Sequence, residues 1–218
     1  MIKVEEIEVF NFKGAFRGMR NPLESWSQSD SQEVLKINPY VFKGDIKEYI
    51  REFIIGKKDM ELALRLVKGG TDHSKFMRQI LVCMDISAPL YWWKEFDTYK
   101  VATVANSTST MHKLGSRLLN ANDFSWDKIT PFRDNVLYYL NKLITKWQVD
   151  KNNKEVWREM IQDLPDSFIQ MRTWTGNYQV LRNMYFARRN HKQQEWRDFC
   201  KMIEGLPYSE LITVNKEQ

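Results

Sequence analysis

The sequence predicts an α+β fold, a helix-rich single domain with a modest mixed sheet. Two segments of the first half alternate between apolar and polar residues as strands do, and the second half holds four successive helical segments. No Pro-, Gly- or Ser-rich linker is long enough to separate two domains, and the chain has no internal repeat. We therefore expect residues 1–218 to form one domain, with about residues 206–218 as a tail.

The first half is expected to open with a half-buried strand over residues 1–12, where apolar residues alternate. Residues 17–37 are polar and turn-rich, which indicates an ordered loop that ends in a short helix. Apolar side chains at positions 46, 50, 53 and 54 have the spacing of a helix over residues 46–55. A second helix should start at Asp59 and stop at Gly69-Gly70, a suitable C-terminal cap.

The middle of the chain contains a second strand and a segment without a clear period. Clean alternation predicts a strand over residues 80–86, with Ile80, Val82, Met84 and Ile86 on one side. Residues 97–112 are rich in small and hydroxyl side chains. Such a segment rarely forms core, so we expect it to lie against a ligand or another chain.

The second half is expected to be helical. Thr130 is a suitable N-cap and Pro131 a suitable first residue for a helix that ends near Gln148. Most of the eight scattered tryptophans should lie in the core. The remaining expected helices cover residues 152–162, 177–189 and 191–203.

Composition excludes several classes of protein. Lys and Arg outnumber Asp and Glu by 33 to 28, and a net charge of +5 with interleaved signs does not identify a nucleic-acid binder. No apolar run approaches the roughly 20 residues of a membrane span, and the acidic N-terminus is unlike a signal peptide. Cys83 and Cys200 match no metal-ligand spacing. We expect a cytoplasmic protein with reduced thiols and no metal.

The residues alone offer few candidates for chemistry. There is no Gly-rich phosphate loop and no GxSxG, HExxH or CxxC motif, so catalytic residues are unknown. Asn177, Asn183 and Arg188 fall on one expected helix, with Asn177 and Arg188 three turns apart on one face. Two amides and a guanidinium suit a base and a phosphate. A solvated helix side is the alternative, and the basic run 188–192 is open to the same interpretation.

Residues 173–197, TWTGNYQVLRNMYFARRNHKQQEWR, resemble the C-terminal signature of the flavin-dependent thymidylate synthases, also called thymidylate synthase-complementing proteins. Trp174 and Thr175 match its Trp-Thr pair, and the two asparagines and the arginine keep its spacing. The resemblance implies that Asn177 and Asn183 are flavin-side residues. It likewise implies that Arg188 contacts the nucleotide.

Upstream, GGTDHSKFMRQILVCMDI is similar to the Gly-His segment and strand of the same family. His73 matches the family's flavin-contacting histidine. The Glu-His that follows in the family is Arg78-Gln79 here.

The family's Arg-His-Arg motif is replaced. Its counterpart is Thr98-Tyr99-Lys100, followed after seven residues by Thr108 where the family has Ser. By this resemblance Lys100 is a cofactor-side candidate and Thr108, or Ser109 after a one-residue slip, a substrate-side candidate. Further family positions are also changed, with Asn106 for Glu and with Thr110 and Ile161 for Arg.

The resemblance implies reductive methylation of dUMP to dTMP, with FAD as the cofactor and with methylenetetrahydrofolate and NADPH as further substrates. It also implies a homotetramer that binds a pyrimidine deoxynucleotide. The lost arginines leave two alternatives open: a non-catalytic flavin- or nucleotide-binding protein on the same fold, or an interaction module for nucleic acid or protein.

Phosphate contacts could come from Arg188, Lys100 or Arg182, or by compensation from other arginines, namely Arg17, Arg20 and Arg172. Such divergence suits a phage-like or other mobile element as well as a host gene.

Overall fold

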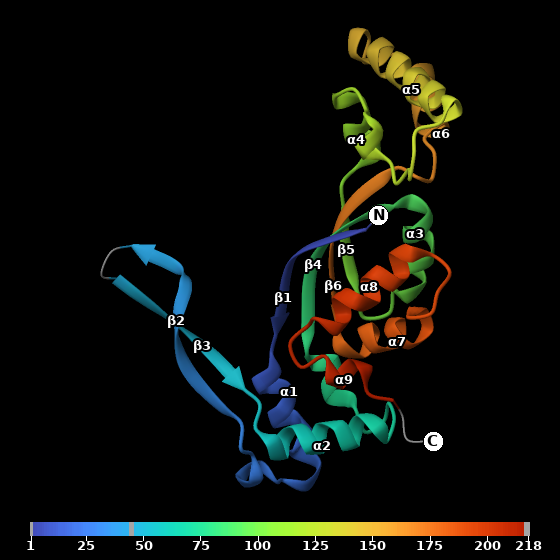
Figure 1. The fold of residues 1–218 in the computed structure, drawn as a ribbon. Coiled ribbons are helices and arrows are strands. Elements are labelled where there is room, and N and C mark those ends of the chain that lie inside the picture. The colour runs from blue at the N-terminus through green and yellow to red at the C-terminus, as the bar shows by residue number, and fades with distance from the viewer. Residues whose placement is uncertain (1, 44–45, 216–218) are drawn as a thin grey trace. The chain divides into compact units, whose positions relative to one another are not determined.

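A computed structural model describes residues 2–43 and 46–215 (Figure 1). The chain divides into two compact units, each assembled from separate stretches of sequence. Unit 1 contains residues up to 8 together with 83–176 and 188–202, and unit 2 contains the described parts of 9–82, 177–187 and the stretch from 203 onward. Among the residues described, each helix is too short or too polar to span a lipid bilayer.

A four-stranded sheet has the strand order β1-β4-β6-β5. Its strands are β1 (Lys3–Phe10), β4 (Leu81–Pro89), β5 (Val104–Ser107) and β6 (Ile169–Asn177). β5 pairs antiparallel with β6, with Val104 opposite Thr175. The strands expected near residues 1–12 and 80–86 are confirmed, and Val82, Met84 and Ile86 are fully buried. Together with the helices, this sheet confirms the α+β fold class.

Two predictions for residues 17–55 are wrong. The expected helix over residues 46–55 is strand β3 (Ile46–Ile54), and it pairs antiparallel with β2 (Gln32–Lys43), where a short helix was expected. α1 (Phe12–Met19) comes before them. Helix-like spacing misled because the Ile and Phe residues of 46–55 also favour strands, and each strand obtains its hydrogen bonds from the other. Exposure of Leu35 (67%) shows that burial on one face does not define this hairpin.

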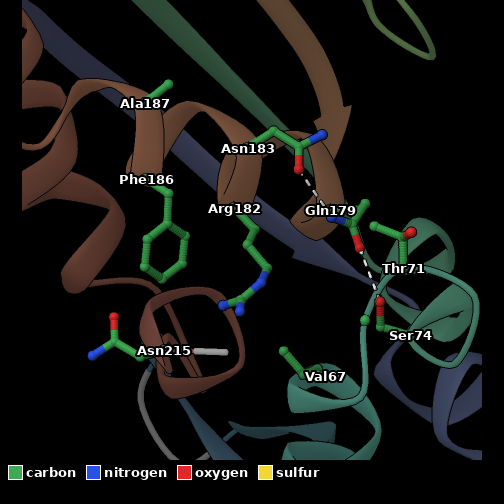
Figure 2. A pocket seen from close by; sticks show the side chains of 10 residues that line it. Val67, Thr71, Ser74, Gln179, Arg182, Asn183, Phe186, Ala187 and Asn215 are labelled. Carbon is green, nitrogen blue, oxygen red and sulfur yellow. Dashed lines mark hydrogen bonds between the residues drawn. The ribbon is translucent and has the colours of Figure 1, made fainter. Parts of the chain in front are cut away.

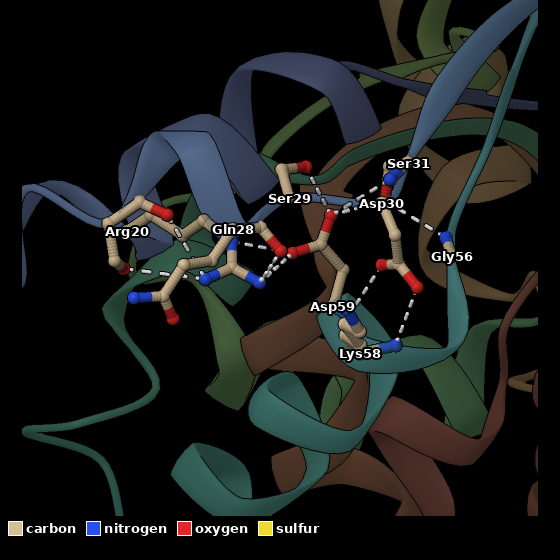
Figure 3. A network of polar contacts seen from close by, with 9 residues as sticks. Arg20, Gln28, Ser29, Asp30, Ser31, Gly56, Lys58 and Asp59 are labelled. Atoms are coloured by element: carbon tan, nitrogen blue, oxygen red, sulfur yellow. Dashed lines mark hydrogen bonds and ion pairs between the residues drawn. The ribbon is translucent and has the colours of Figure 1, made fainter.

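A buried ion pair anchors the loop between α1 and β2 in unit 2 (Figure 3). Arg20 Nε donates to Asp59 Oδ1 at 2.6 Å, and the two side chains are only 4% and 1% exposed. The hydroxyls of Ser29 and Ser31 both donate to Asp59 Oδ2 at 2.5 Å. Asp59 lies in the first turn of α2 (Lys57–Lys68), and Gly69 caps the C-terminus of that helix as expected.

An aromatic core fills part of unit 1. α3 (Leu90–Phe96) contributes most of it, and α8 (Gln194–Glu204) contributes Trp196 and Phe199. Trp92 lies 4.8 Å from Trp196, centroid to centroid, and Phe96 packs edge-on against Trp174. Four of the eight tryptophans are thus core residues: Trp92, Trp93, Trp174 and Trp196.

The helices expected in the second half are present. α5 (Pro131–Val149) begins after Thr130, whose side chain accepts from Arg133 N, and it shares a hydrophobic cluster with α6 (Lys154–Gln162). α7 (Tyr178–Arg188) follows β6 directly. The short elements before α5 are α4 (Thr110–Lys113) and the 3-10 helices Asn21–Leu23, Trp26–Gln28, Lys75–Gln79, Asp97–Tyr99, Leu114–Ser116 and Ala121–Asp123.

The expected tail at 206–218 is corrected for its described part. α9 (Glu210–Thr213) places Leu211 and Ile212 at 0% exposure. The apolar Leu211-Ile212 pair drives this burial, and it outweighs the polar character of the surrounding residues. Residues 216–218 lie outside the described chain.

Candidate functional site

A pocket of about 900 Å³ lies within unit 2 (Figure 2). Its walls come from the end of α2, the turn that follows, one side of α7 and Asn215, the second residue after α9 (Glu210–Thr213). We call it the α7 pocket. Its volume falls within the range that small molecules and cofactors occupy. The lining residues are Val67, Gly70, Thr71, Ser74, Gln179, Arg182, Asn183, Phe186, Ala187 and Asn215.

Asn177 sets the start of α7. Its Oδ1 accepts a hydrogen bond from Val180 N at 3.0 Å, and the residue is 4% exposed. This is the geometry of a helix N-cap, which satisfies one of the otherwise unpaired N–H groups of the first turn. Asn177 is absent from the lining of the α7 pocket. It therefore orients the helix that carries the pocket residues.

A hydrogen-bond relay orients the amide of Asn183 (Figure 2). Ser74 Oγ donates to Gln179 Oε1 at 3.2 Å, and Gln179 Nε2 donates to Asn183 Oδ1 at 3.1 Å. Because Oδ1 of Asn183 is the acceptor of this relay, its Nδ2 is left to donate elsewhere. The relay ties the turn after α2 to one side of α7.

Arg182 is a buried cation in this pocket. The residue is 4% exposed, its Nη1 donates to Ile212 O at 2.6 Å, and its Cζ lies 4.7 Å from the Phe186 ring centroid. Its Nη2 is buried and has no hydrogen-bond partner. Burial lowers the pKa of the guanidinium below its usual value. A buried charged donor without an acceptor costs about 1–3 kcal/mol or more, so this arrangement favours the arrival of an acceptor.

His73 is close in the chain to residues that line the α7 pocket, but it lines a different cavity itself. Its backbone neighbours Thr71 and Ser74 line the α7 pocket, whereas His73 and Asp72 line a second cavity of about 440 Å³ in unit 2. The His73 side chain is exposed.

Arg188 is engaged within unit 1. Its Nη1 donates to Glu95 Oε1, and its Nε donates to the Tyr99 hydroxyl at 2.8 Å. Its Cζ lies 4.9 Å from the Trp196 ring centroid. Arg188 therefore has protein partners in unit 1, and it is not among the residues that line the α7 pocket.

The substrate-side candidates line a smaller pocket in unit 1, of about 250 Å³. Thr108 Oγ1 donates to Met171 O at 3.2 Å, and Ser109 Oγ accepts from His112 N as the N-cap of α4. Lys113 lines the same pocket. Lys100, at the end of the 3-10 helix Asp97–Tyr99, is exposed and does not line it.

Two arginines considered as phosphate contacts have protein partners instead. Arg20 pairs with Asp59 in the buried network. Arg172 Nη1 pairs with Asp97 at 2.8 Å, and its Cζ lies 4.1 Å from the Trp93 centroid. In the described residues, no cluster of three or more His, Cys, Asp or Glu side chains could hold a metal ion.

Sequence reasoning missed Ser74, Gln179, Phe186 and Asn215 as pocket residues. The spacing of Gln179 and Asn183, four residues apart on a helix, is a signal that predicts a side-chain hydrogen bond. Asn215 offers no such signal, because only the burial of α9 carries it to the pocket wall.

Comparison with solved structures assigns the architecture to a class: the chain has the fold of the flavin-dependent thymidylate synthases. It is similar to thymidylate synthase X (ThyX) from Helicobacter pylori, solved with FAD and dUMP, with a TM-score of 0.67 and 16% identity over 97% of this chain and 96% of that one. A second structure of flavin-dependent thymidylate synthase ThyX from Helicobacter pylori, complexed with FAD and dUMP, gives 0.68 and 16% over 98% and 100%.

The fold expected from the resemblance is thus confirmed, at a sequence identity of 16%. No protein-family model matches the sequence, and no curated protein matches it.

Proposed function

We propose that this protein binds a flavin nucleotide in the α7 pocket and a pyrimidine deoxynucleotide, as a divergent flavin-dependent thymidylate synthase. The observation that carries the proposal is the α7 pocket itself. It joins Asn183, which the resemblance assigns to the flavin, to Gly70, Thr71 and Ser74 of the turn that contains His73, although His73 itself lines a different cavity. The two similar ThyX structures from Helicobacter pylori were solved with FAD and dUMP.

The donors of the α7 pocket suit FAD. The described lining residues include amide and hydroxyl groups and the Arg182 guanidinium, and none of them is Asp or Glu. Amides can serve the carbonyls and ring nitrogens of a flavin, and a cation can serve its phosphates. Residues that would hold FAD are Asn183, Gln179, Ser74 and Arg182. FAD would supply hydride chemistry there, while the protein binds and orients it.

The proposed reaction is reductive methylation of dUMP, with methylenetetrahydrofolate and NADPH as co-substrates. The nucleotide candidates Thr108 and Ser109 share their pocket with Lys113, a cation able to contact a phosphate. Arg188, the nucleotide residue by resemblance, is already paired with Glu95. We therefore expect dUMP to bind more weakly than it would at a site with several unpaired arginines, since each charge-assisted contact contributes about 1.5–3 kcal/mol.

The second candidate function is flavin and nucleotide binding without methyl transfer. The pairing of Arg188 with Glu95 and the replacement of Arg-His-Arg by Thr98-Tyr99-Lys100 favour it. The α7 pocket is compatible with both candidates.

An oligomer also forms part of the proposal. β5 is at one end of the sheet order, all four of its residues are exposed, and Val104 is 66% exposed. Exposed apolar side chains on an edge strand suit burial against another copy of the chain. We propose a homotetramer in the cytoplasm, as the resemblance implies. Multi-angle light scattering that finds four chains per particle would support it, and a monomer would contradict it.

Thermal melting with dUMP, followed by an assay for dTMP, separates the two candidate functions. dUMP at a hundred times its dissociation constant should stabilise the protein by about 2.7 kcal/mol. For a chain of this size that corresponds to a rise in Tm of roughly 5–10 °C. Formation of dTMP with FAD, NADPH and methylenetetrahydrofolate identifies a synthase. A rise in Tm without dTMP identifies the binding protein, and no rise contradicts nucleotide binding.

A further inference from the structure

The charge of Arg182 is incompletely satisfied by the protein. Nη1 has a fixed acceptor in the carbonyl of Ile212, while Nη2 is buried without a partner. Figure 2 shows the guanidinium extending from α7 into the space bordered by Phe186, Val67 and Asn215. Buried guanidinium groups normally use several of their donors, and a lone unsatisfied one indicates a missing acceptor.

The missing acceptor has a definable chemistry. Arg182 remains protonated at all physiological pH values, and none of the described residues that line the α7 pocket is an acid. An anionic group from a ligand would therefore meet a cation that no lining carboxylate competes for. Phosphate matches this requirement, because its oxygens accept several hydrogen bonds from a guanidinium fork.

We propose that Arg182 forms an anion subsite in the α7 pocket that binds the phosphate groups of a flavin nucleotide. The identity of the ligand rests on the proposed function, whereas the preference for an anion rests on Arg182 itself. The subsite would supply a cation in a chain where Thr98 and Tyr99 replace two basic residues of the Arg-His-Arg motif.

The surroundings of Arg182 fix the orientation of its guanidinium. Ile212 belongs to the short helix α9, and Phe186 lies one turn further along α7. The carbonyl of Ile212 holds Nη1 at 2.6 Å, and the Phe186 ring lies 4.7 Å from Cζ. A guanidinium that is already positioned loses little conformational entropy when it binds an anion. An unanchored lysine on the surface would lose more.

The test compares three flavins that differ in phosphate content. Riboflavin has none, FMN has one and FAD has two. Affinities are measured by quenching of flavin fluorescence for the wild-type protein, Arg182→Met and Arg182→Lys. The control Arg65→Met removes an arginine that is exposed on α2 and does not line the α7 pocket. Inorganic pyrophosphate is tested separately by its effect on Tm.

We expect the wild type and the Arg65→Met variant to bind FAD about 10- to 100-fold more tightly than riboflavin, the range of one charge-assisted contact. Arg182→Met should remove that preference, so that FAD and riboflavin bind to this variant with similar affinities. Arg182→Lys should reduce the preference, since lysine keeps the charge and loses the planar fork. If Arg182→Met does not fold, the anion subsite is still tested by comparing the preference for FAD over riboflavin in the wild type with that in Arg182→Lys.

The outcomes separate the subsite from the flavin assignment. Equal affinity of the wild type for riboflavin and FAD would overturn the subsite and leave flavin binding intact. No binding of any flavin, with a rise in Tm by pyrophosphate that Arg182→Lys weakens, would overturn the proposed flavin and support the anion subsite. A preference for FAD that persists in both Arg182 variants would overturn the role of Arg182. No binding of either flavin or pyrophosphate would overturn both proposals.

Discussion

Glu95 and Arg188 form an ion pair whose side chains are 31% and 18% exposed. The second oxygen of Glu95 accepts from Trp196 Nε1 at 2.5 Å, so the carboxylate joins α3, the end of α7 and α8. Arg188 lies over Trp196 as well. A nucleotide phosphate at Arg188 would have to compete with this carboxylate, and the ion pair therefore defines Arg188 first as a structural residue.

Replacement of Arg188 by Gln should lower the free energy of unfolding by about 1–3 kcal/mol, because Glu95 loses its ion pair and Trp196 loses its cation–π contact with the guanidinium. Urea denaturation provides the measurement, with Lys192→Gln, an exposed position nearby, as the control. Unchanged stability combined with a large loss of dUMP affinity would contradict the structural role and favour the nucleotide-side assignment.

The two asparagines of α7 should separate stability from binding. Asn177→Ala removes the N-cap and should cost about 1 kcal/mol of stability, while Asn177→Ser keeps a capping oxygen and should cost less. Asn183→Ala should change stability by less than about 0.5 kcal/mol, since the residue is exposed, and should weaken FAD binding roughly tenfold. Urea melts and FAD titrations of the three variants test this. An Asn183→Ala protein with normal FAD affinity would exclude that residue from the site.

The Arg20–Asp59 pair predicts a dependence of stability on pH. Burial alone would raise the pKa of Asp59, but hydrogen bonds from Ser29, Ser31 and Arg20 outweigh it and lower the pKa below 3.8. Because the carboxyl pKa is lower in the folded state, this contribution is complete above pH 3.8 and is lost as pH falls through the folded value.

Asp59→Asn should accordingly reduce stability at pH 7 by about 3–5 kcal/mol, since Arg20 is left buried without its counter-ion. The variant should also lose part of the decline in stability that the wild type shows below about pH 4. Asp127→Asn, at an exposed carboxylate, is the control. Parallel pH profiles of the wild type and Asp59→Asn would refute the lowered pKa.

Gly176 allows Trp174 to pack in the core of unit 1. A Cβ at position 176 would lie 2.2 Å from Trp174 Cη2. Gly176→Ala should therefore destabilise the protein by about 1–3 kcal/mol through overpacking. Gly69→Ala is the matched control, because its Cβ would have no neighbour closer than 3.4 Å. Thermal unfolding of both variants gives the comparison, and equal Tm values would show that the tryptophan can move aside.

Local patterns predicted much of the fold because the relevant forces are local. Thr130 and Pro131 mark the start of α5, and the alternation of Val82, Met84 and Ile86 marks a strand with one buried side. Strand β3 could not be predicted in the same way. Its hydrogen bonds come from β2, and a periodicity of apolar residues does not reveal a partner strand.

In the candidate site, too, some features could be predicted from local sequence and others depend on tertiary contacts. Asn183 was identified through its place in the signature, and the structure positions it in the α7 pocket. The role of Asn177 as a helix cap and the pairing of Arg188 with Glu95 depend on contacts that spacing along one helix cannot show. Arg182 could be named as a cation from the sequence, but its unsatisfied Nη2 is a property of the folded chain.

The most direct test of flavin binding is the absorbance spectrum of the purified protein after incubation with FAD and removal of unbound flavin. The α7 pocket predicts that the wild-type protein retains FAD. The flavin absorbance of the Asn183→Ala variant should be lower, because this variant retains less FAD. A colourless wild-type protein that also fails to quench FAD fluorescence would contradict flavin binding in the α7 pocket. Only the fold would then be shared with the flavin-dependent thymidylate synthases.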